Sequence, residues 1–326
     1  MTLFPFIEPQ YYLNKLFPFF KTGTLSPFRP NPKNGVLCYN LGLRWLQVKL
    51  SPETIRQLQK KQLEILLEFD KAARKMGLSY TLSSGTLLGA VRHGGFIPWD
   101  DDADVAMLRE DYERFWKEGQ KHLPDYLFIQ HYETDRDYPH NFIKIVDTRT
   151  RLVEHTTSQS DIKRGVFIDI FPIDRIPDSR ILRTLDRICL TFIYFTRYSV
   201  TLKFQKKSHS RMRKIASRLL RPLGKALGVH RLNQWETRIK TKYNHHSKFE
   251  YTYGDNSILV PTEIKESMIL PVRIFQDLEE IRFEGHSFLA IKDRDRYLRT
   301  LYGDHYMELP PEEKQKPKHT FTELQL

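Results

Sequence analysis

The stretch Leu78–Met107 reads LSYTLSSGTLLGAVRHGGFIPWDDDADVAM and predicts a strand, a glycine turn, a short helix, a tight loop and an acidic strand in succession. Apolar and polar residues alternate from 78 to 83, which is typical of a half-buried strand. The Ser-Gly-Thr turn then breaks the alternation, and we expect a helix from Leu87. Because the first amides of a helix lack intrahelical partners, the turn predicts an anion site at Gly85 and Thr86.

Four carboxylates follow within five residues, at Asp100, Asp101, Asp102 and Asp104. Residues 105–107 continue as a strand, so Asp102 and Asp104 share one face at a spacing that allows two carboxylates to bind one divalent ion. Asp101 is expected to point the opposite way. The alternative interpretation is an acidic loop that caps a following helix. An anion site followed closely by an aspartate pair favours a site for a phosphate ester and Mg²⁺.

A fifth carboxylate lies in an apolar strand. Residues 165–171 alternate as expected for a strand, and Asp169 shares one face with Phe167 and Phe171. A buried carboxylate without a partner costs several kcal/mol, so Asp169 either accepts backbone hydrogen bonds or faces a cation. We favour the cation. Asp174, by contrast, is expected in a turn.

Four segments resemble the LicD family of phosphorylcholine-type transferases, which have a nucleotidyltransferase fold and include the fukutin-like proteins. The segments read GTLLGAVRHGGFIPWDDDADVAM from Gly85, KIVDTRT from Lys144, FIDIFPID from Phe167 and YGDHYMELPPEEKQKPKH from Tyr302. The resemblance covers residues 51–174 and 278–320. It departs from the family pattern at Ser84, where a second glycine is usual, and at 273–275, where an acidic-aromatic pair is expected.

The resemblance implies a mixed α/β (α+β) sheet of the nucleotidyltransferase type that carries three metal-binding acids. It also implies a divalent ion, Mg²⁺ or Mn²⁺, and phosphate contacts to a CDP-linked donor. A lysine in a strand is more often a solvated side chain, and this alternative stays open for Lys144. The implied metal ligands are Asp102, Asp104 and Asp169, and the implied phosphate contacts are Gly85, Thr86, Arg92 and Lys144.

The implied activity is the transfer of a phospho-alcohol, such as phosphocholine, from the CDP-linked donor to a hydroxyl of a cell-surface glycan or glycolipid, with release of CMP. Lipopolysaccharide and teichoic acid are acceptors of this kind, and no nucleic acid partner is expected. Two other functions stay open. One is transfer of a nucleoside monophosphate to a small molecule or an RNA end. The other is a non-catalytic, basic, membrane-binding protein on the same fold, which the complete set of acids disfavours.

Composition and pattern predict four parts of the chain. With 326 residues, 40% of them hydrophobic, the chain can bury a substantial core. Residues 1–50 are rich in proline and aromatics and are expected to be irregular, whereas 51–180 form the catalytic core, beginning with a helix capped by Ser51. Residues 181–249 form a basic helical insertion. Residues 250–326 complete the catalytic domain as a wall on the substrate side, with Tyr302, Lys314 and His319 as candidates from the resemblance.

Charge is concentrated in the insertion. Residues 187–235 contain twelve Lys and Arg and no Asp or Glu, while the whole chain has a net charge of +12. A helix expected from Ser210 places basic residues beside an apolar face, as in interfacial helices. It either packs its apolar face on the core or makes a peripheral contact with an anionic membrane. The basic arc comprises Arg211, Lys214, Arg218, Arg221 and Lys225.

The sequence also predicts a cellular location. The early apolar stretch, residues 1–20, is interrupted by prolines and charges, so neither a signal peptide nor a transmembrane helix is expected. Two distant cysteines, Cys38 and Cys189, indicate no disulfide framework and favour a reducing compartment. The expected location is the cytoplasm, with a peripheral position on the inner face of the membrane.

Overall fold

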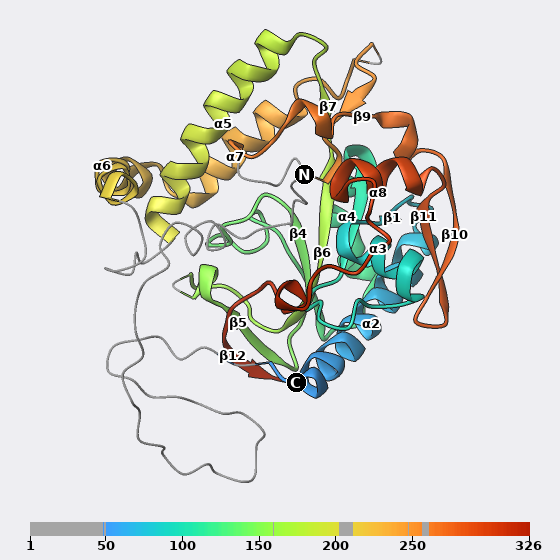
Figure 1. Cartoon of the computed structure of the whole chain (residues 1–326). Helices are drawn as coiled ribbons and strands as arrows, with labels where there is room; N and C mark the ends of the chain where they lie inside the picture. Colours follow the sequence, from blue (N-terminus) through green and yellow to red (C-terminus); the bar gives the residue numbers. More distant parts are fainter. Residues whose placement is uncertain (1–47, 49, 159, 202–210, 247, 256–260) are drawn as a thin grey trace, which may run out of the picture.

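The computed structural model describes residues 48, 50–158, 160–201, 211–246, 248–255 and 261–326, with the side chains of 211–217 left out (Figure 1). The irregular extension expected over residues 1–50 therefore lies almost entirely outside the described residues, as does Cys38.

A five-stranded sheet forms the centre of the molecule, in the order β1-β2-β6-β4-β3. Only β2 and β6 run parallel, and the other neighbours are antiparallel, so the sheet is mixed. The predicted α/β class is thereby confirmed. The strands are β1 Thr81–Leu82, β2 Asp104–Leu108, β3 Leu127–Gln130, β4 Ile143–Asp147 and β6 Val166–Ile173.

Helices α2 (Pro52–Lys75), α3 (Ser84–His93) and α4 (Arg109–Glu118) lie to one side of this sheet in Figure 1. Ser51 caps α2 as predicted, because its Oγ accepts the amide hydrogen of Thr54 at 3.1 Å. Phe69 of α2 contacts Phe115 of α4 edge to face, with ring centroids 5.1 Å apart. These helices bury one face of the sheet and leave the other face to the C-terminal segment.

The insertion contains three helices, α5 (Arg180–Thr201), α6 (Arg211–Leu227) and α7 (Val229–Thr241), as the sequence predicted. Helices α5 and α6 pack closely at Gly224, where an added Cβ would come within 2.5 Å of Val200 Cγ2 and 2.8 Å of the Thr196 carbonyl oxygen. In the described part of the chain, no helix has both the length and the apolar character needed to cross a membrane.

The remaining elements lie around the sheet edges. The hairpin predicted near residue 285 is present as β10 and β11, and the helix start predicted near residue 310 is a single 3-10 turn, η6. These elements are β5 Arg151–Glu154, β7 Arg175–Ile176, β8 Tyr251–Thr252, β9 Leu270–Pro271, β10 Leu278–Phe283, β11 His286–Ile291, α8 Arg294–Tyr302, β12 Phe321–Gln325, and the 3-10 turns η1 Gly119–His122, η2 His155–Thr157, η4 Glu266–Met268, η5 Val272–Phe275 and η6 Glu312–Lys314.

Asp174 lies between the end of β6 and the start of β7, where a turn was expected, but it is a buried ion-pair partner. Its carboxylate accepts hydrogen bonds from Arg109 Nε at 2.8 Å and Nη2 at 2.6 Å, and from Asn244 Nδ2 at 2.7 Å. Arg109 directly follows β2 and Asp174 directly follows β6. Because these strands are parallel neighbours, both side chains emerge at the same edge of the sheet.

Candidate active site

Three charged side chains form a row across the centre of the sheet. Asp104 of β2 pairs with Asp169 of β6, and Asp169 pairs with Lys144 of β4. Directly paired residues point to the same face of a sheet, so the three side chains lie together. All three are buried. The row lies on the face of the sheet opposite α2 and α4.

Asp102 adds a third carboxylate to this row. It precedes β2, two residues before Asp104, and is the most accessible of the three acids, with 13% of its side chain exposed. Its charge contributes to raising the pKa of Asp104 and of Asp169. The structure therefore brings together the three acids that the sequence singled out as metal ligands.

Burial and mutual repulsion make the charged form of these acids unfavourable. Burial raises the pKa of Asp169 to about 7, although the Lys144 ammonium opposes the shift. Burial also raises the pKa of Asp104 well above its usual range, and the charges of Asp102 and Asp169 add to this effect. One oxygen of Asp169 lies 3.3 Å from Lys144 Nζ without accepting a hydrogen bond. Clustered carboxylate oxygens with unmet charge fit a hard divalent cation such as Mg²⁺ or Mn²⁺.

Lys144 belongs to the row and is not a solvated side chain. Its Nζ donates to Glu154 Oε2 at 3.0 Å and lies 3.2 Å from the centroid of the Phe167 ring. Glu154 is buried too, and although burial would raise its pKa, Lys144 holds that pKa below its usual range. No local sequence pattern points to Glu154, because only the folded structure brings the end of β5 next to Lys144 of β4.

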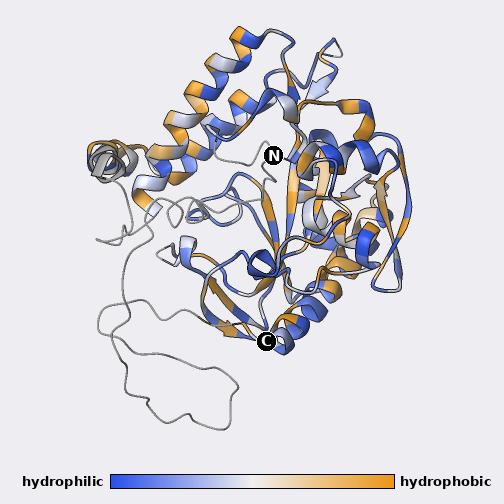
Figure 2. Cartoon of the chain, in the orientation of Figure 1, coloured by the Kyte–Doolittle hydropathy of each residue, from blue (hydrophilic) through white to orange (hydrophobic). Residues whose placement is uncertain are grey.

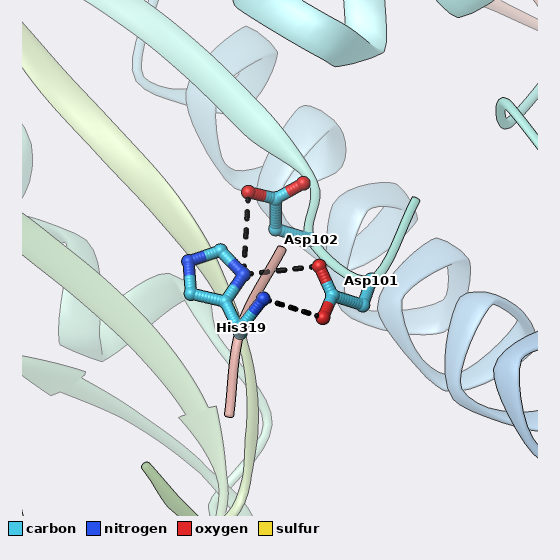
Figure 3. Close-up of side chains that lie close together, drawn as sticks. All are labelled: Asp101, Asp102 and His319. Atoms are coloured by element: carbon cyan, nitrogen blue, oxygen red, sulfur yellow. Dashed lines mark hydrogen bonds and ion pairs between the residues drawn. The ribbon is translucent and has the colours of Figure 1, made fainter. Parts of the chain in front are cut away.

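His319 connects the acidic loop to the C-terminal segment (Figure 3). Asp101 accepts the backbone amide hydrogen of His319 at 3.0 Å, and one of its oxygens lies 3.0 Å from His319 Nδ1. The same ring nitrogen lies 3.7 Å from Asp102 Oδ2. The two aspartates therefore meet at one imidazole, in contrast to the expectation that Asp101 points away from Asp102. Burial would raise the pKa of Asp101, but His319 brings it below its usual range.

Among the described residues, the group whose potential metal-ligand atoms all lie within 4.8 Å of one another is Asp101, Asp102 and His319, distinct from the acidic row. Asp102 belongs to both sets. Asp101 is already engaged by two backbone amides of the C-terminal segment, including that of Lys318 at 3.4 Å. We therefore assign Asp101 mainly to holding that segment in place.

Asp100 lies against the start of α3. An added Cβ on Gly85 would come within 2.5 Å of Asp100 Oδ2, so only glycine allows this approach. Lys318 Nζ lies 3.7 Å from Asp100 Oδ1. Burial raises the pKa of Asp100 to about 7, and Lys318 counteracts part of the shift. The predicted anion position at the N-terminus of α3 is thus next to a carboxylate of the chain itself.

Thr86 and Arg92 lie on the same helix and make different contacts. Thr86 Oγ1 accepts the backbone amide hydrogen of Asp104 at 2.8 Å, which fixes the start of β2. Arg92, in the last turn of α3, donates from Nη1 to the carbonyl oxygens of Tyr306 at 2.9 Å and Glu308 at 3.0 Å. Thr86 is therefore next to the acids, whereas Arg92 holds the C-terminal segment.

The other C-terminal candidates differ in position. Tyr302 is half-buried, its hydroxyl has no hydrogen-bond partner among the described residues, and desolvation raises its pKa. The charges of Lys318, Asp100 and Asp104 act on it, which places it beside the acids. Lys314 is exposed in η6. Of the three candidates, Tyr302 and His319 are part of the site.

The sequence is similar to known transferases. Residues 77–226 match the LicD/FKTN/FKRP nucleotidyltransferase domain. The chain is 30% identical over 281 residues to the lipopolysaccharide cholinephosphotransferase LicD of Haemophilus influenzae, across 82% of this chain and 96% of the relative. It is 27% identical over 131 residues to mouse ribitol-5-phosphate transferase FKTN, across 40% of this chain and 25% of the relative. It is 54% identical over 35 residues to human ribitol 5-phosphate transferase FKRP, across 11% of this chain and 7% of the relative.

The match to the Haemophilus protein extends over almost the whole of that relative, and at 82% of this chain it includes the acidic row. The mixed sheet with its carboxylates agrees with the nucleotidyltransferase domain that the match describes. The chain therefore belongs to the LicD/FKTN/FKRP nucleotidyltransferase-domain family and is a phospho-alcohol transferase of the LicD type.

Proposed function

We propose that this protein transfers phosphocholine, or a related phospho-alcohol, from a CDP-linked donor to a hydroxyl of a cell-surface glycan or glycolipid. The observation that carries the proposal is the row of buried carboxylates, in which one oxygen of Asp169 accepts no hydrogen bond. Such a row matches the need of a diphosphate donor for a divalent cation. The names of the relatives support choline or ribitol as the transferred alcohol.

Asp102, Asp104 and Asp169 are the residues that would hold the cation. When bound, a divalent ion neutralises charge on the diphosphate of the donor. Asp102 is the most accessible of the three and would be the ligand nearest to solvent and donor, whereas the buried Asp104 and Asp169 would complete the ligand set from the sheet. His319 contacts Asp102 and either orients it or supplies a further ligand.

The proposed reaction is a substitution at the phosphorus that bears the alcohol. A bond forms between the acceptor oxygen and this phosphorus, and the bond to the bridging oxygen breaks, so that CMP leaves with the electron pair. The acceptor proton passes to a carboxylate of the site or to water. Lys144 stays paired with Glu154 and Asp169 and keeps the row in position. We propose Gly85 and Thr86 as phosphate contacts at the N-terminus of α3, and we assign Arg92 to holding the C-terminal segment.

The acceptor would be a lipid-linked glycan reached from the cytoplasm, with the protein at the inner face of the membrane. This location is a proposal that follows from the nature of the acceptor. An alternative reaction with the same acids is the transfer of the nucleoside monophosphate itself. The two reactions differ in which phosphorus is attacked, and that difference can be measured.

The test is turnover with a panel of CDP-choline, CDP-ribitol and CDP-glycerol, each with lipopolysaccharide or teichoic acid as acceptor. CMP release that requires both an acceptor and Mg²⁺ or Mn²⁺ is the expected result, and the donor with the highest rate identifies the alcohol. Control reactions in which EDTA removes the metal should be inactive. Release of free phospho-alcohol in place of CMP, in proportion to acceptor, would show that the nucleotide is the group transferred.

A further inference from the structure

Helix α5 has one apolar face that no described part of the chain covers. Its residues recur three and four positions apart, so they form a stripe along one side of the helix. Figure 2 shows apolar residues recurring along the whole length of α5. The α5 stripe comprises Ile181, 74% exposed, Leu182, 43%, Leu185, 52%, Ile188, 61%, and Phe192, 48%.

The opposite face of α5 is fixed to the rest of the molecule, so the stripe cannot turn inward. Arg183 Nη2 contacts Glu266 Oε2 at 2.5 Å, and Arg187 Nη1 donates to the carbonyl oxygen of Ile264 at 3.0 Å. Between these two contacts along the helix, Asp186 pairs with Lys242. The helix is therefore held in one rotational setting with its apolar side outward.

Helix α6 adds further apolar residues and the positive charge. Leu219 and Leu223 lie one turn apart and are 74% and 40% exposed. Gly224 packs against Thr196 and Val200 of α5, one to two turns beyond the end of the stripe, and Figure 1 shows α6 beside this end of α5. Three exposed basic residues lie among these leucines, namely Arg218, Arg221 and Lys225.

The positive charge of this segment distinguishes between two possible partners of the surface, a second copy of the chain and a lipid bilayer. A second copy of the chain would bring two segments together that each carry twelve Lys and Arg and no acid between residues 187 and 235. Like charges in contact cost free energy, so self-association through this face is disfavoured. An anionic bilayer offers phosphates for the basic residues and an apolar interior for the stripe.

We propose that the α5 stripe, together with the exposed residues of α6, is a docking surface for an anionic lipid bilayer. Helix α5 lies in the plane of the interface, because its inner face carries the ion pairs that attach it to the protein. The sequence interpretation placed a possible membrane contact within the basic segment 187–235, on the amphipathic helix from residue 210, and the proposed surface adds the exposed stripe of α5. Docking does not depend on the proposed reaction, since it needs neither donor nor acceptor.

Co-sedimentation of the full chain with vesicles tests the proposal. The protein should pellet with phosphatidylcholine vesicles that contain phosphatidylglycerol, and not with phosphatidylcholine alone. The apolar variant is Leu185→Ser/Ile188→Ser, and the charge variant is Arg218→Gln/Arg221→Gln/Lys225→Gln. The matched control is Met307→Ser, since Met307 is 50% exposed and lies on no helix of the insertion.

The apolar variant should lower the vesicle partition coefficient by about tenfold or more, because two apolar side chains that would insert among the acyl chains are replaced by serine. The charge variant should weaken it by about 100-fold at low salt, since each basic residue contributes roughly fivefold. The control should stay within about twofold of wild type. Unchanged thermal unfolding would show that all variants are folded.

The fluorescence of a dye attached beside the α5 stripe tests whether the stripe contacts the vesicle. Cys189 is exposed next to Ile188 and can carry a polarity-sensitive dye in a Cys38→Ser background. Its emission should shift to the blue when anionic vesicles are added. The proposal is overturned if wild type does not bind these vesicles, or if both variants bind as wild type does. Stripe variants that dissociate a dimer and leave vesicle binding absent would identify the surface as a subunit interface.

Discussion

Asp169 illustrates how much a single side chain can reveal. An acid between two phenylalanines on an apolar strand indicated a cation partner, and the structure places Asp169 in register with both Asp104 and Lys144. Lys144 neutralises only part of the charge, because it also pairs with Glu154. The remaining charge is what a divalent ion would balance. These contacts make the two buried aspartates the most informative residues to change.

Replacing either aspartate should separate catalysis from stability. Asp104→Asn and Asp169→Asn should each lower turnover by roughly 10²–10⁴-fold, since several kcal/mol of transition-state stabilisation would be lost. Thermal stability should stay equal or rise, because removing a charge relieves repulsion in the buried row. Steady-state rates and melting temperatures measure the two effects, with the exposed Asp178→Asn as control. A less stable protein with normal activity per folded molecule would mean that the replaced acid is structural.

The close approach of the Asp100 carboxylate requires glycine at position 85. Gly85→Ala would place a Cβ within 2.5 Å of Asp100 Oδ2, and it should destabilise the protein by about 1–3 kcal/mol. The double variant Gly85→Ala/Asp100→Ala removes the clashing carboxylate and should recover much of that loss. Chemical denaturation of the four proteins of this cycle gives the coupling. Additive effects of the two changes would show that the approach of Asp100 is not what requires glycine.

At the scale of elements, periodicity predicted most helices and the central strands. Ser51 marked the start of α2 correctly, and the alternation around Asp169 marked β6. Asp174 was assigned to a turn, because its partner Arg109 is 65 residues away and only the parallel pairing of β2 with β6 brings them together. Local sequence also could not show that Asp101 and Asp102 both face His319, which lies more than 200 residues later.

The Arg109–Asp174 pair should contribute strongly to stability. It links the ends of β2 and β6, and Asp174 also bonds Asn244 just after α7. Asp174→Asn should cost about 3–5 kcal/mol in the free energy of unfolding, because it leaves a buried arginine without its counter-charge. Replacing an exposed partner, as in Glu64→Gln beside Lys61, should cost less than about 1 kcal/mol. Urea denaturation compares the two. Equal losses would show that burial of the pair has no special effect.

This pair also predicts a pH dependence. Burial would raise the pKa of Asp174, but Arg109 holds it below its usual range. Since this carboxyl has a lower pKa in the folded state than in the unfolded state, its contribution is complete above about pH 4 and is lost as the pH falls through the folded-state pKa. Wild type should therefore lose more stability than Asp174→Asn below pH 4. Parallel denaturation curves for the two proteins across this range would contradict the assignment.

At the scale of the whole molecule, the acidic loop, the sheet and the C-terminal segment meet at one site. Arg92 and Asp101 attach the C-terminal segment to this site from two sides, through Tyr306 and through His319. The resemblance of four separate motifs to one family predicted that these parts work together. The sequence could not predict the α5 stripe, since its exposure depends on which face of α5 the ion pairs hold inward.

The central claim is that the acidic row directs attack at the phosphorus that bears the alcohol. The most direct measurement uses CDP-choline labelled with ³²P only at the phosphate next to choline, incubated with Mg²⁺ and a glycan acceptor. The label should appear on the acceptor and the released CMP should be unlabelled, and Asp169→Asn should form much less of both products. Label released as free phosphocholine, with cytidine monophosphate attached to the acceptor, would contradict it.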